Sequence, residues 1–305
     1  LAKSGAKILL IELASYLGDR SIVDEFSINN GNSAGWIKDI ETELSGFENV
    51  KIRTSTMASG VYDHGYVLAY EQVADHLPGN GQPRHRLWRI RAKRVVTATG
   101  AIERPLVFPG NDVPGVMLAS AIRDYHKLYG ISPGDRTVVL TNNDDAYKTA
   151  IELNKSGLSV PAIIDTRSDV NSPIFDYVKS LGIKVKTGKG VSKVVGSKRL
   201  TSIGICSHRG EGTVEEMIDC NVLAISGGWS PVVHLWSHAG GKVIWDNEKS
   251  MFLPDRNSTP IGDDGLNFVR TVGATSGALD ASKILLSSKV VASELAEEFG
   301  LKTKK

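Results

Sequence analysis

Several features that define common functional classes are scarce or missing in this sequence of 305 residues. Cys206 and Cys220 are the only cysteines, and they do not form a Cys-x-x-Cys pair, so the redox dithiol of a disulfide reductase is not encoded. We expect both to be buried, reduced thiols. The formal net charge is only +2, which argues against a nucleic-acid partner.

Long apolar segments are also absent. No run approaches the roughly 18 residues needed to span a bilayer, and no signal-peptide pattern is present, so we expect a cytoplasmic protein without a membrane anchor. No Ser/His/Asp arrangement and no convincing carboxylate pair is found, so the sequence names no catalytic residue. His234 and His238 have the spacing of metal ligands on a helix, but no further ligand is evident nearby, and we predict no metal site.

Glycine is missing where a nucleotide-binding turn would need it. The segment VVLTNNDDAYKTAIEL, residues 138–153, has the order strand, break and helix that is typical of such a turn. Phosphate normally approaches the backbone at glycines, yet every residue from 141 to 146 carries a side chain, and Asp144 and Asp145 would repel a diphosphate. We predict that this turn is vestigial and that the two aspartates form the N-cap and first turn of the helix.

An internal repeat indicates two related units. LAKSGAKILLIELA at residues 1–14 and LNKSGLSVPAIIDTR at residues 153–167 share Leu-x-Lys-Ser-Gly, and each continues into an apolar strand that ends in an acid, Glu12 or Asp165. KRVVTATGAIERP and NVLAISGGWSP form a second matching pair. The repeat predicts an α/β fold of two Rossmann-like units, of the two-dinucleotide-binding, FAD/NAD-linked reductase type. We assign residues 1–130 and 262–305 to the first unit and residues 131–261 to the second.

The repeat also predicts that the first unit is incomplete at its N-terminus. In the second unit a strand, a turn and a helix precede Leu153, whereas Leu1 occupies the matching place in the first unit. A segment of roughly twenty residues, the size of a strand, turn and helix, is thus expected to be missing, which makes the chain a fragment of a longer protein. The strand at residues 7–11 would then have an unpaired edge, through which we expect the fragment to self-associate.

Local patterns predict the remaining elements. We expect helices at residues 34–44 and 119–129, three-stranded meanders near residues 61–90 and 190–218, and a long amphipathic helix after the glycine turn at 273. Between residues 84 and 94 several arginines alternate along a strand. A solvated face is the simpler interpretation of this basic stretch, and a docking surface for a partner or an anionic cofactor is the alternative.

At VTATGAIERPLVFPGNDVPGVM (96–117) and TVGATSGALDASKIL (271–285), together with the double unit, the chain resembles the alpha subunit of heterotetrameric sarcosine oxidase. Similar alpha subunits occur in related amine and proline dehydrogenases. The resemblance covers essentially all 305 residues but only the middle of that subunit, without its ferredoxin-like region and its folate-binding domain. It implies a beta subunit that holds FAD and oxidises the amine, an FMN between the subunits, and NAD in the first unit.

The same resemblance implies a reaction and a set of contact residues. The reaction is the oxidative demethylation of sarcosine to glycine, with formaldehyde passed to tetrahydrofolate and hydrogen peroxide formed. Glu12, at a strand end, is the candidate for the ribose hydroxyls, with an ordinary strand-end charge as the alternative. Gly273 and Ala274 stand where flavin-binding relatives carry Gly-Asp, and the missing carboxylate favours NAD. The full set of cofactor-binding candidates is Glu12, Met57, Thr99, Gly100, Gly273, Ala274, Leu279 and Ala281.

Three classes of function follow from these patterns. The leading hypothesis is a nucleotide-binding region of a sarcosine oxidase-like oxidoreductase that acts on CH–NH donors and is inactive without its partners. A free-standing FAD/NAD(P)-dependent oxidoreductase of the pyridine nucleotide-disulfide reductase-like class is the second. An interaction scaffold without a bound nucleotide is the third. Absorbance near 450 nm would identify the second, and nucleotide released on denaturation would separate the first from the third.

Overall fold

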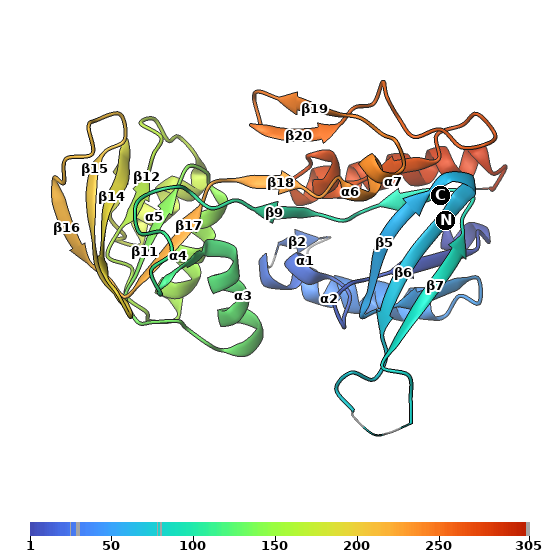
Figure 1. Ribbon diagram of the computed structural model, residues 1–305, viewed down its shortest axis with the longest axis horizontal. Helices are drawn as coiled ribbons and strands as arrows, with labels where there is room; N and C mark the ends of the chain where they lie inside the picture. Colours follow the sequence, from blue (N-terminus) through green and yellow to red (C-terminus); the bar gives the residue numbers. More distant parts are fainter. Residues whose placement is uncertain (25, 29–30, 78, 80, 303–305) are drawn as a thin grey trace. The chain divides into compact units, whose positions relative to one another are not determined.

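The chain folds into two compact units. The computed structural model describes residues 1–24, 26–28, 31–77, 79 and 81–302 (Figure 1). Unit 1 comprises Leu1–Ile102 and Pro231–Lys305, and unit 2 comprises Glu103–Ser230. The chain passes between the units within β9 (Ala101–Glu103) and again within β18 (Trp229–Pro231).

Unit 2 is built on a five-stranded parallel sheet with the strand order β10-β17-β11-β12-β13. These strands are, in the same order, Val116–Leu118, Val222–Ser226, Thr137–Thr141, Ile163–Asp165 and Val185–Thr187. Every residue of β11 and β17 is buried, as expected for central parallel strands that are covered on both faces. β11 therefore lies in the middle of the sheet, between β17 and β12, the strand that ends at Asp165.

Two hydrophobic cores cover the two faces of this sheet. Successive residues of a strand point to opposite faces, so Val139 enters one core and its neighbour Leu140 enters the other. Helices form the first core, and an antiparallel meander, β14-β15-β16, contributes to the second. The helices are α3 (Ala119–Tyr129), α4 (Asp145–Lys155) and α5 (Pro173–Ser180), and the meander strands are β14 (Lys189–Gly196), β15 (Leu200–Ser207) and β16 (Glu216–Asp219).

Unit 1 contains two separate parallel strand pairs. β1 (Ile8–Ile11) pairs with β4 (Val50–Arg53), and β8 (Val95–Thr97) pairs with β21 (Val269–Thr271). The repeat relates β1 to β12 and β8 to β17, which in unit 2 flank the central β11. Within the described residues no strand of unit 1 takes the place of β11, so the second edge of β1 is open, as the repeat predicts.

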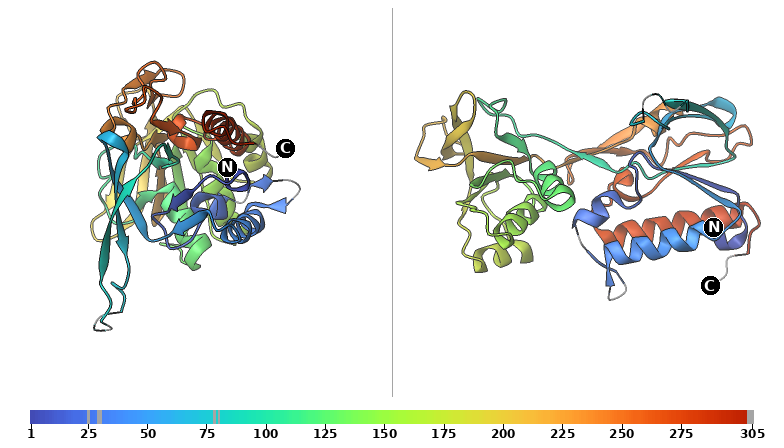
Figure 2. Two further views of the ribbon diagram at one scale, coloured as in Figure 1. Left: turned by 90° about the vertical axis from the view of Figure 1, so that its right-hand side faces the viewer. Right: turned by 90° about the horizontal axis from the view of Figure 1, so that it is seen from below.

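An antiparallel meander and a small core complete unit 1 (Figures 1 and 2). The meander consists of β5 (Thr56–Tyr62), β6 (Tyr66–Gln72) and β7 (His85–Arg91). Its core cluster contains Val61, Val67, Trp236, Phe268 and Val269. The other elements are the 3-10 turns η1 (Ala2–Ser4), η2 (Asp63–Gly65) and η3 (Gly273–Ser276), the helices α1 (Asp19–Asp24), α2 (Ser33–Ser45), α6 (His234–His238) and α7 (Ala281–Glu298), and the strands β2 (Ser27–Ile28), β3 (Gly31–Asn32), β19 (Val243–Asp246) and β20 (Met251–Pro254).

The observed units differ in their boundaries from those predicted at 130/131 and 261/262. Residues 103–130 lie in unit 2, because α3 packs against α4 and β17 there. Residues 231–261 lie in unit 1, because Trp236 belongs to its core cluster and β20 contacts η3. The sequence gives little indication of either assignment, because it does not show which core receives α3, or α6, β19 and β20.

The predicted helices are found close to their expected bounds. α2 begins after Asn32, whose side-chain oxygen accepts a hydrogen bond of 2.7 Å from the backbone N–H of Gly35. α3 ends at Gly130, which adopts the left-handed conformation with φ 64°. Such caps satisfy backbone groups that a helix leaves unpaired at its ends.

Cys206 and Cys220 are both free and buried, as predicted. Burial raises the pKa of the Cys220 thiol to about 12, so this residue is not a nucleophile at neutral pH. None of the helices described here is both long and apolar enough to cross a membrane.

Candidate functional site

The structure places Glu12 directly after β1, at the carboxyl end of the strand. Its backbone N–H donates to Arg53 O of the neighbouring strand (2.8 Å), and its backbone oxygen accepts from Thr56 N (2.8 Å). One carboxylate oxygen, Oε1, accepts from Ala14 N (2.8 Å), which orients the side chain. No described residue donates to Oε2, so this oxygen remains available for a ligand hydroxyl.

Met57 lies next to this strand end, because the preceding residue, Thr56, donates its backbone N–H to Glu12 O. Its side chain is 46% exposed on β5, where it stands opposite Tyr70 of β6. The side chain is therefore not part of the core. Glu12 and the backbone of Met57 form the first group of candidate contacts.

Thr99 and Gly100 form a second group at the end of β8. The Thr99 hydroxyl donates to Val232 O (2.7 Å) and lies 3.1 Å from Thr275 Oγ1. The Thr275 hydroxyl in turn is 3.3 Å from Gly100 O. Gly100 has φ 74°, and no heavy atom lies within 4 Å of the place that a Cβ would occupy, so its backbone is open to a ligand on that side.

Gly273 and Ala274 belong to the same group, because η3 carries them alongside Thr275. Gly273 has φ 68°, and its N–H lies 3.3 Å from Ser287 Oγ of α7. Its carbonyl accepts from Ala278 N (3.2 Å), which closes the turn. Ala274 is half-buried and offers no carboxylate, whereas an aspartate here would add one acceptor for a sugar or ribityl hydroxyl.

Leu279 and Ala281 flank the start of α7. Asp280 is the N-cap, and its carboxylate accepts from the backbone N–H groups of Ser282 (2.9 Å) and Lys283 (3.3 Å). Leu279 lies outside the helix and is 48% exposed, while Ala281 is its first residue. Because Asp280 already uses these helix N–H groups, this end of α7 is not a ready anion site.

Two residues of this site, Thr275 and Asp280, were not identified from the sequence. Thr275 joins the Thr99 and Gly273 segments, and its only signal was a small polar residue inside a run of glycines. Asp280 has the stronger signal of an acid directly before an amphipathic helix. Within the described residues, no hydrogen bond connects the Glu12 group to the Thr99 group.

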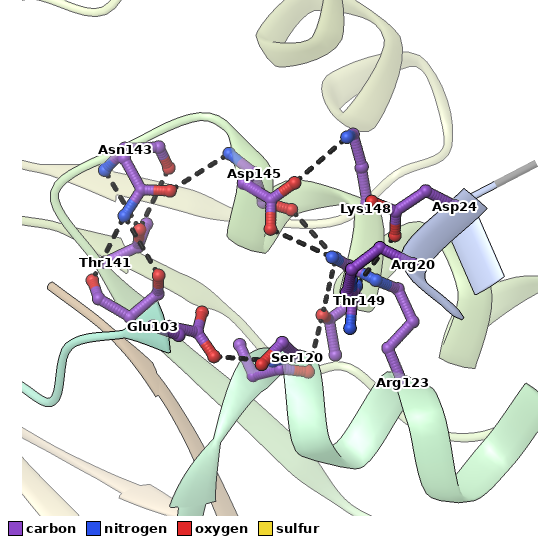
Figure 3. A network of polar contacts seen from close by, with 12 residues as sticks. Arg20, Asp24, Glu103, Ser120, Arg123, Thr141, Asn143, Asp145, Lys148 and Thr149 are labelled. Atoms are coloured by element: carbon purple, nitrogen blue, oxygen red, sulfur yellow. Dashed lines mark hydrogen bonds and ion pairs between the residues drawn. The ribbon is translucent and has the colours of Figure 1, made fainter. Parts of the chain in front are cut away.

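Side chains of the glycine-free turn of unit 2 accept hydrogen bonds from two of its backbone N–H groups (Figure 3). Asn143 N donates to Thr141 Oγ1 (3.0 Å), and Asp145 N donates to Asn143 Oδ1 (3.1 Å). The Asn143 amide nitrogen donates to Ser226 Oγ (3.0 Å) at the end of β17. Two N–H groups that could approach a pyrophosphate, those of Asn143 and Asp145, are therefore occupied by side chains of the turn itself.

The two aspartates of this turn are held by arginines. Asp144 stands at the N-cap position, but its side chain makes no capping hydrogen bond, so the prediction was wrong for this side chain. The Asp144 carboxylate instead accepts a hydrogen bond from Arg167 Nη2 (2.8 Å). Asp145 is in the first turn of α4, as predicted, and accepts from Arg123 Nη2 (2.9 Å). Burial alone would raise the pKa of Asp145, but the charges of Arg123 and Lys148 lower it to about 2.

Asp165, the acid that ends β12, is fully buried and has no free acceptor capacity for a ribose. Its carboxylate accepts from Tyr147 Oη (2.9 Å) and from three atoms of Arg167: N (2.9 Å), Nε (3.0 Å) and Nη2 (2.7 Å). Burial, with the neighbouring carboxylate, raises the pKa of Tyr147, which therefore stays protonated. Arg167 thus fills the space beside β12 with a charge that the protein itself neutralises.

We expect this turn to bind neither NADH nor NADPH, because its donors are used internally and its carboxylates repel phosphate. Calorimetric titration of the chain with each nucleotide should show no binding at the turn. N143A should not change that result, and N171A, an exposed loop substitution in the same unit, serves as the control. Micromolar binding that disappears in N143A but persists in N171A would contradict the prediction.

No protein-family model matches the chain. It is 36% identical to "Sarcosine oxidase subunit alpha" of Corynebacterium sp. (strain P-1) over 309 aligned positions, which cover 98% of this chain and 31% of that protein. It is also 36% identical to the protein of that name in Rhizobium meliloti (strain 1021), over 90% of this chain and 27% of the relative. The chain therefore spans about three tenths of the length of these relatives, and the predicted resemblance to sarcosine oxidase alpha subunits is confirmed.

Solved structures confirm the fold class. Lactococcus lactis thioredoxin reductase matches with a TM-score of 0.70 at 17% identity, over 97% of this chain and 92% of that one. L-proline dehydrogenase from P. horikoshii matches with a TM-score of 0.69 at 21% identity, over 99% of this chain and 54% of that one. At these identities the likeness establishes the fold, two Rossmann-like units, and nothing about chemistry.

Proposed function

We propose that this chain is the nucleotide-binding region of a sarcosine oxidase-like alpha subunit, and that its nucleotide is NAD bound at unit 1. The observation that carries the proposal is the contrast between the units. In unit 2 the turn and the strand-end acid are occupied by Asn143, Arg123 and Arg167. In unit 1 the strand-end acid Glu12 has a carboxylate oxygen, Oε2, to which none of the described residues donates.

The residues of unit 1 fit part of a dinucleotide. Glu12 Oε2 can accept from a ribose hydroxyl, and the open backbone at Gly100 allows close approach of a ligand. Ala274 removes the carboxylate that a ribityl chain would use, which favours NAD over FAD at this position. Thr99 and Thr275 fix the two loops to each other. When bound, a nicotinamide dinucleotide supplies a ring that can exchange hydride.

The activity that we propose belongs to the assembled complex. A beta subunit would carry FAD and oxidise the amine, and FMN would lie at the interface of the two subunits. The complex would demethylate sarcosine to glycine, pass formaldehyde to tetrahydrofolate and form hydrogen peroxide. The names of the relatives at 36% identity support a sarcosine oxidase made of more than one subunit. No acid–base pair is found among the candidate contacts of unit 1, which agrees with chemistry that takes place in another subunit.

The purified chain alone should release no hydrogen peroxide from sarcosine, since the amine site lies in the beta subunit. A peroxidase-coupled assay measures this directly, with and without an added sarcosine oxidase beta subunit. Peroxide formation by the chain alone would overturn the proposal and favour the free-standing oxidoreductase. Bound flavin, seen as absorbance near 450 nm in the chain alone, would point the same way.

A further inference from the structure

Thr275 places a buried hydroxyl between two loops of unit 1. It lies in η3, after β21, and is fully buried. Its Oγ1 is 3.1 Å from the hydroxyl oxygen of Thr99 and 3.3 Å from the carbonyl oxygen of Gly100, at the end of β8. One side chain thus bridges the two segments that supply four of the candidate nucleotide contacts, namely Thr99, Gly100, Gly273 and Ala274.

The direction of these hydrogen bonds follows from the number of hydroxyl protons. The Thr99 hydroxyl donates its single proton to Val232 O at 2.7 Å. Its oxygen can then only accept from Thr275, so the Thr275 proton is shared between Thr99 Oγ1 and Gly100 O. Val232 N also donates to Gly100 O (3.0 Å). These groups form one connected network, in which Thr275 is the donor that joins η3 to the end of β8.

The network fixes the part of Gly100 that a ligand can reach. Gly100 has φ 74°, and its backbone is open on the side where a Cβ would point. Among the described residues none accepts a hydrogen bond from the Gly100 N–H. This N–H lies between the Thr99 side chain and the Gly100 carbonyl, and the network holds both of them. The direction of an available backbone donor therefore depends on Thr275.

A second buried threonine of the same strand makes a different contact. Thr97 is 3% exposed, and its Oγ1 is 3.3 Å from Arg270 O of β21. At this point backbone pairing already joins the two strands, with Thr97 opposite Thr271. The strand pairing ends at these two residues, so the Thr97 hydroxyl supports a paired region, whereas Thr275 connects the loops that follow it.

We propose that Thr275 is a positioning residue for the nucleotide of unit 1, and that its hydroxyl holds the Thr99–Gly100 backbone in the orientation that binds NAD. The inference rests on the proposed function, because it requires that NAD binds at unit 1. Thr275 is fully buried, so it acts through Thr99 and Gly100 and not by touching the ligand. A backbone that is already held in the bound orientation loses less conformational freedom when the ligand binds.

The test compares two substitutions that separate the two parts of the Thr275 side chain. T275V keeps the shape of the side chain and removes the hydroxyl, whereas T275S keeps the hydroxyl and removes the methyl group. T275V should weaken NAD binding about tenfold, and T275S should bind NAD like the wild type. Ligand-observed NMR titration with NAD, which detects millimolar binding, gives the affinities. It is applied to the chain and to the chain extended by an opening strand, glycine-rich turn and helix.

Two further measurements separate positioning from stability. T275S should lower the melting temperature, because it removes a buried methyl group, and yet keep its affinity for NAD. The matched control is T97V, which makes the same chemical change at a buried threonine of β8 and should bind NAD like the wild type. Hydrogen exchange of the Val232 N–H, measured without nucleotide, should be faster in T275V than in T275S or T97V, because Gly100 O has lost one of its two donors.

The outcomes distinguish this inference from the proposed function. If neither form of the wild-type chain binds NAD, the proposed function fails, and the role of Thr275 fails with it. If the wild type binds NAD and T275V binds it equally well, the function stands and Thr275 is only part of the core. An equal loss of affinity in T275S or T97V would also overturn the inference, since packing or general stability would then explain it. Unchanged exchange of the Val232 N–H in T275V would contradict the network.

Discussion

Adding a strand, a glycine-rich turn and a helix ahead of Leu1 should raise the affinity of unit 1 for NAD by at least about 100-fold. The added turn would supply backbone N–H groups for the pyrophosphate, and two hydrogen bonds to a charged group at about 1.5–3 kcal/mol each account for a change of this size. The segment is taken from the Corynebacterium sp. (strain P-1) alpha subunit, which is 36% identical to this chain. Calorimetry with NAD measures the affinity of both proteins.

The same addition should turn a self-associating chain into a monomer. Among the described strands β1 pairs with β4 alone, and its other edge presents a row of backbone N–H and C=O groups that can template pairing with another strand. A second copy of the chain can pair with this open edge. Sedimentation velocity gives the mass of each protein.

A control separates the two effects of the added segment. Replacing the glycines of its turn by valine keeps the strand that covers β1 but blocks the approach of phosphate to the backbone. This version should be monomeric and should bind NAD as weakly as the original chain. Equal NAD affinity in the original and extended chains, with both monomeric, would show that the repeat has been misinterpreted.

Removing the Asp165 carboxylate should destabilise the protein strongly. D165A leaves the Tyr147 hydroxyl and the Arg167 guanidinium without their buried acceptor, and breaking a buried pair in this way costs about 3–5 kcal/mol. For a unit of this size that corresponds to a decrease in melting temperature of about 10 °C or more. Thermal unfolding followed by circular dichroism measures the difference.

The control for this substitution is D169A, four residues further along the chain. Asp169 is exposed, and its removal should change stability by less than about 0.5 kcal/mol. D165N should fall between the two, because an amide oxygen still accepts a hydrogen bond from Tyr147 but carries no charge for Arg167. If D165A were as stable as D169A, the cluster would contribute nothing to folding, and its role in filling the nucleotide site would be in doubt.

Much of the fold could be predicted because it depends on local patterns. The repeated Leu-x-Lys-Ser-Gly and the acids Glu12 and Asp165 fixed the strand ends, since a short apolar run followed by a charge has few alternatives in a parallel sheet. The long helix after Gly273 follows from amphipathic spacing. The boundaries of the units could not be predicted, because they depend on which core receives α3 and Trp236, and that is decided by contacts between distant segments.

The sequence by itself determined that unit 2 lacks the glycines of a nucleotide turn, and its repeat predicted that β1 would have one unpaired edge, as it has among the described strands. These are properties of residue type and of repeat alignment, which need no coordinates. Only the tertiary structure showed which side chains neutralise Asp144 and Asp145, the aspartates of the glycine-free turn. Arg123 and Arg167 come from elements 22 and 23 residues away from the aspartates that they neutralise, so their pairing had no local signal. Packing likewise decided which face of the meander is exposed. Alternation along β7 places Arg89 and Arg91 on the same face of the strand, and that face is exposed because the opposite face packs on the core that contains Val61 and Val67.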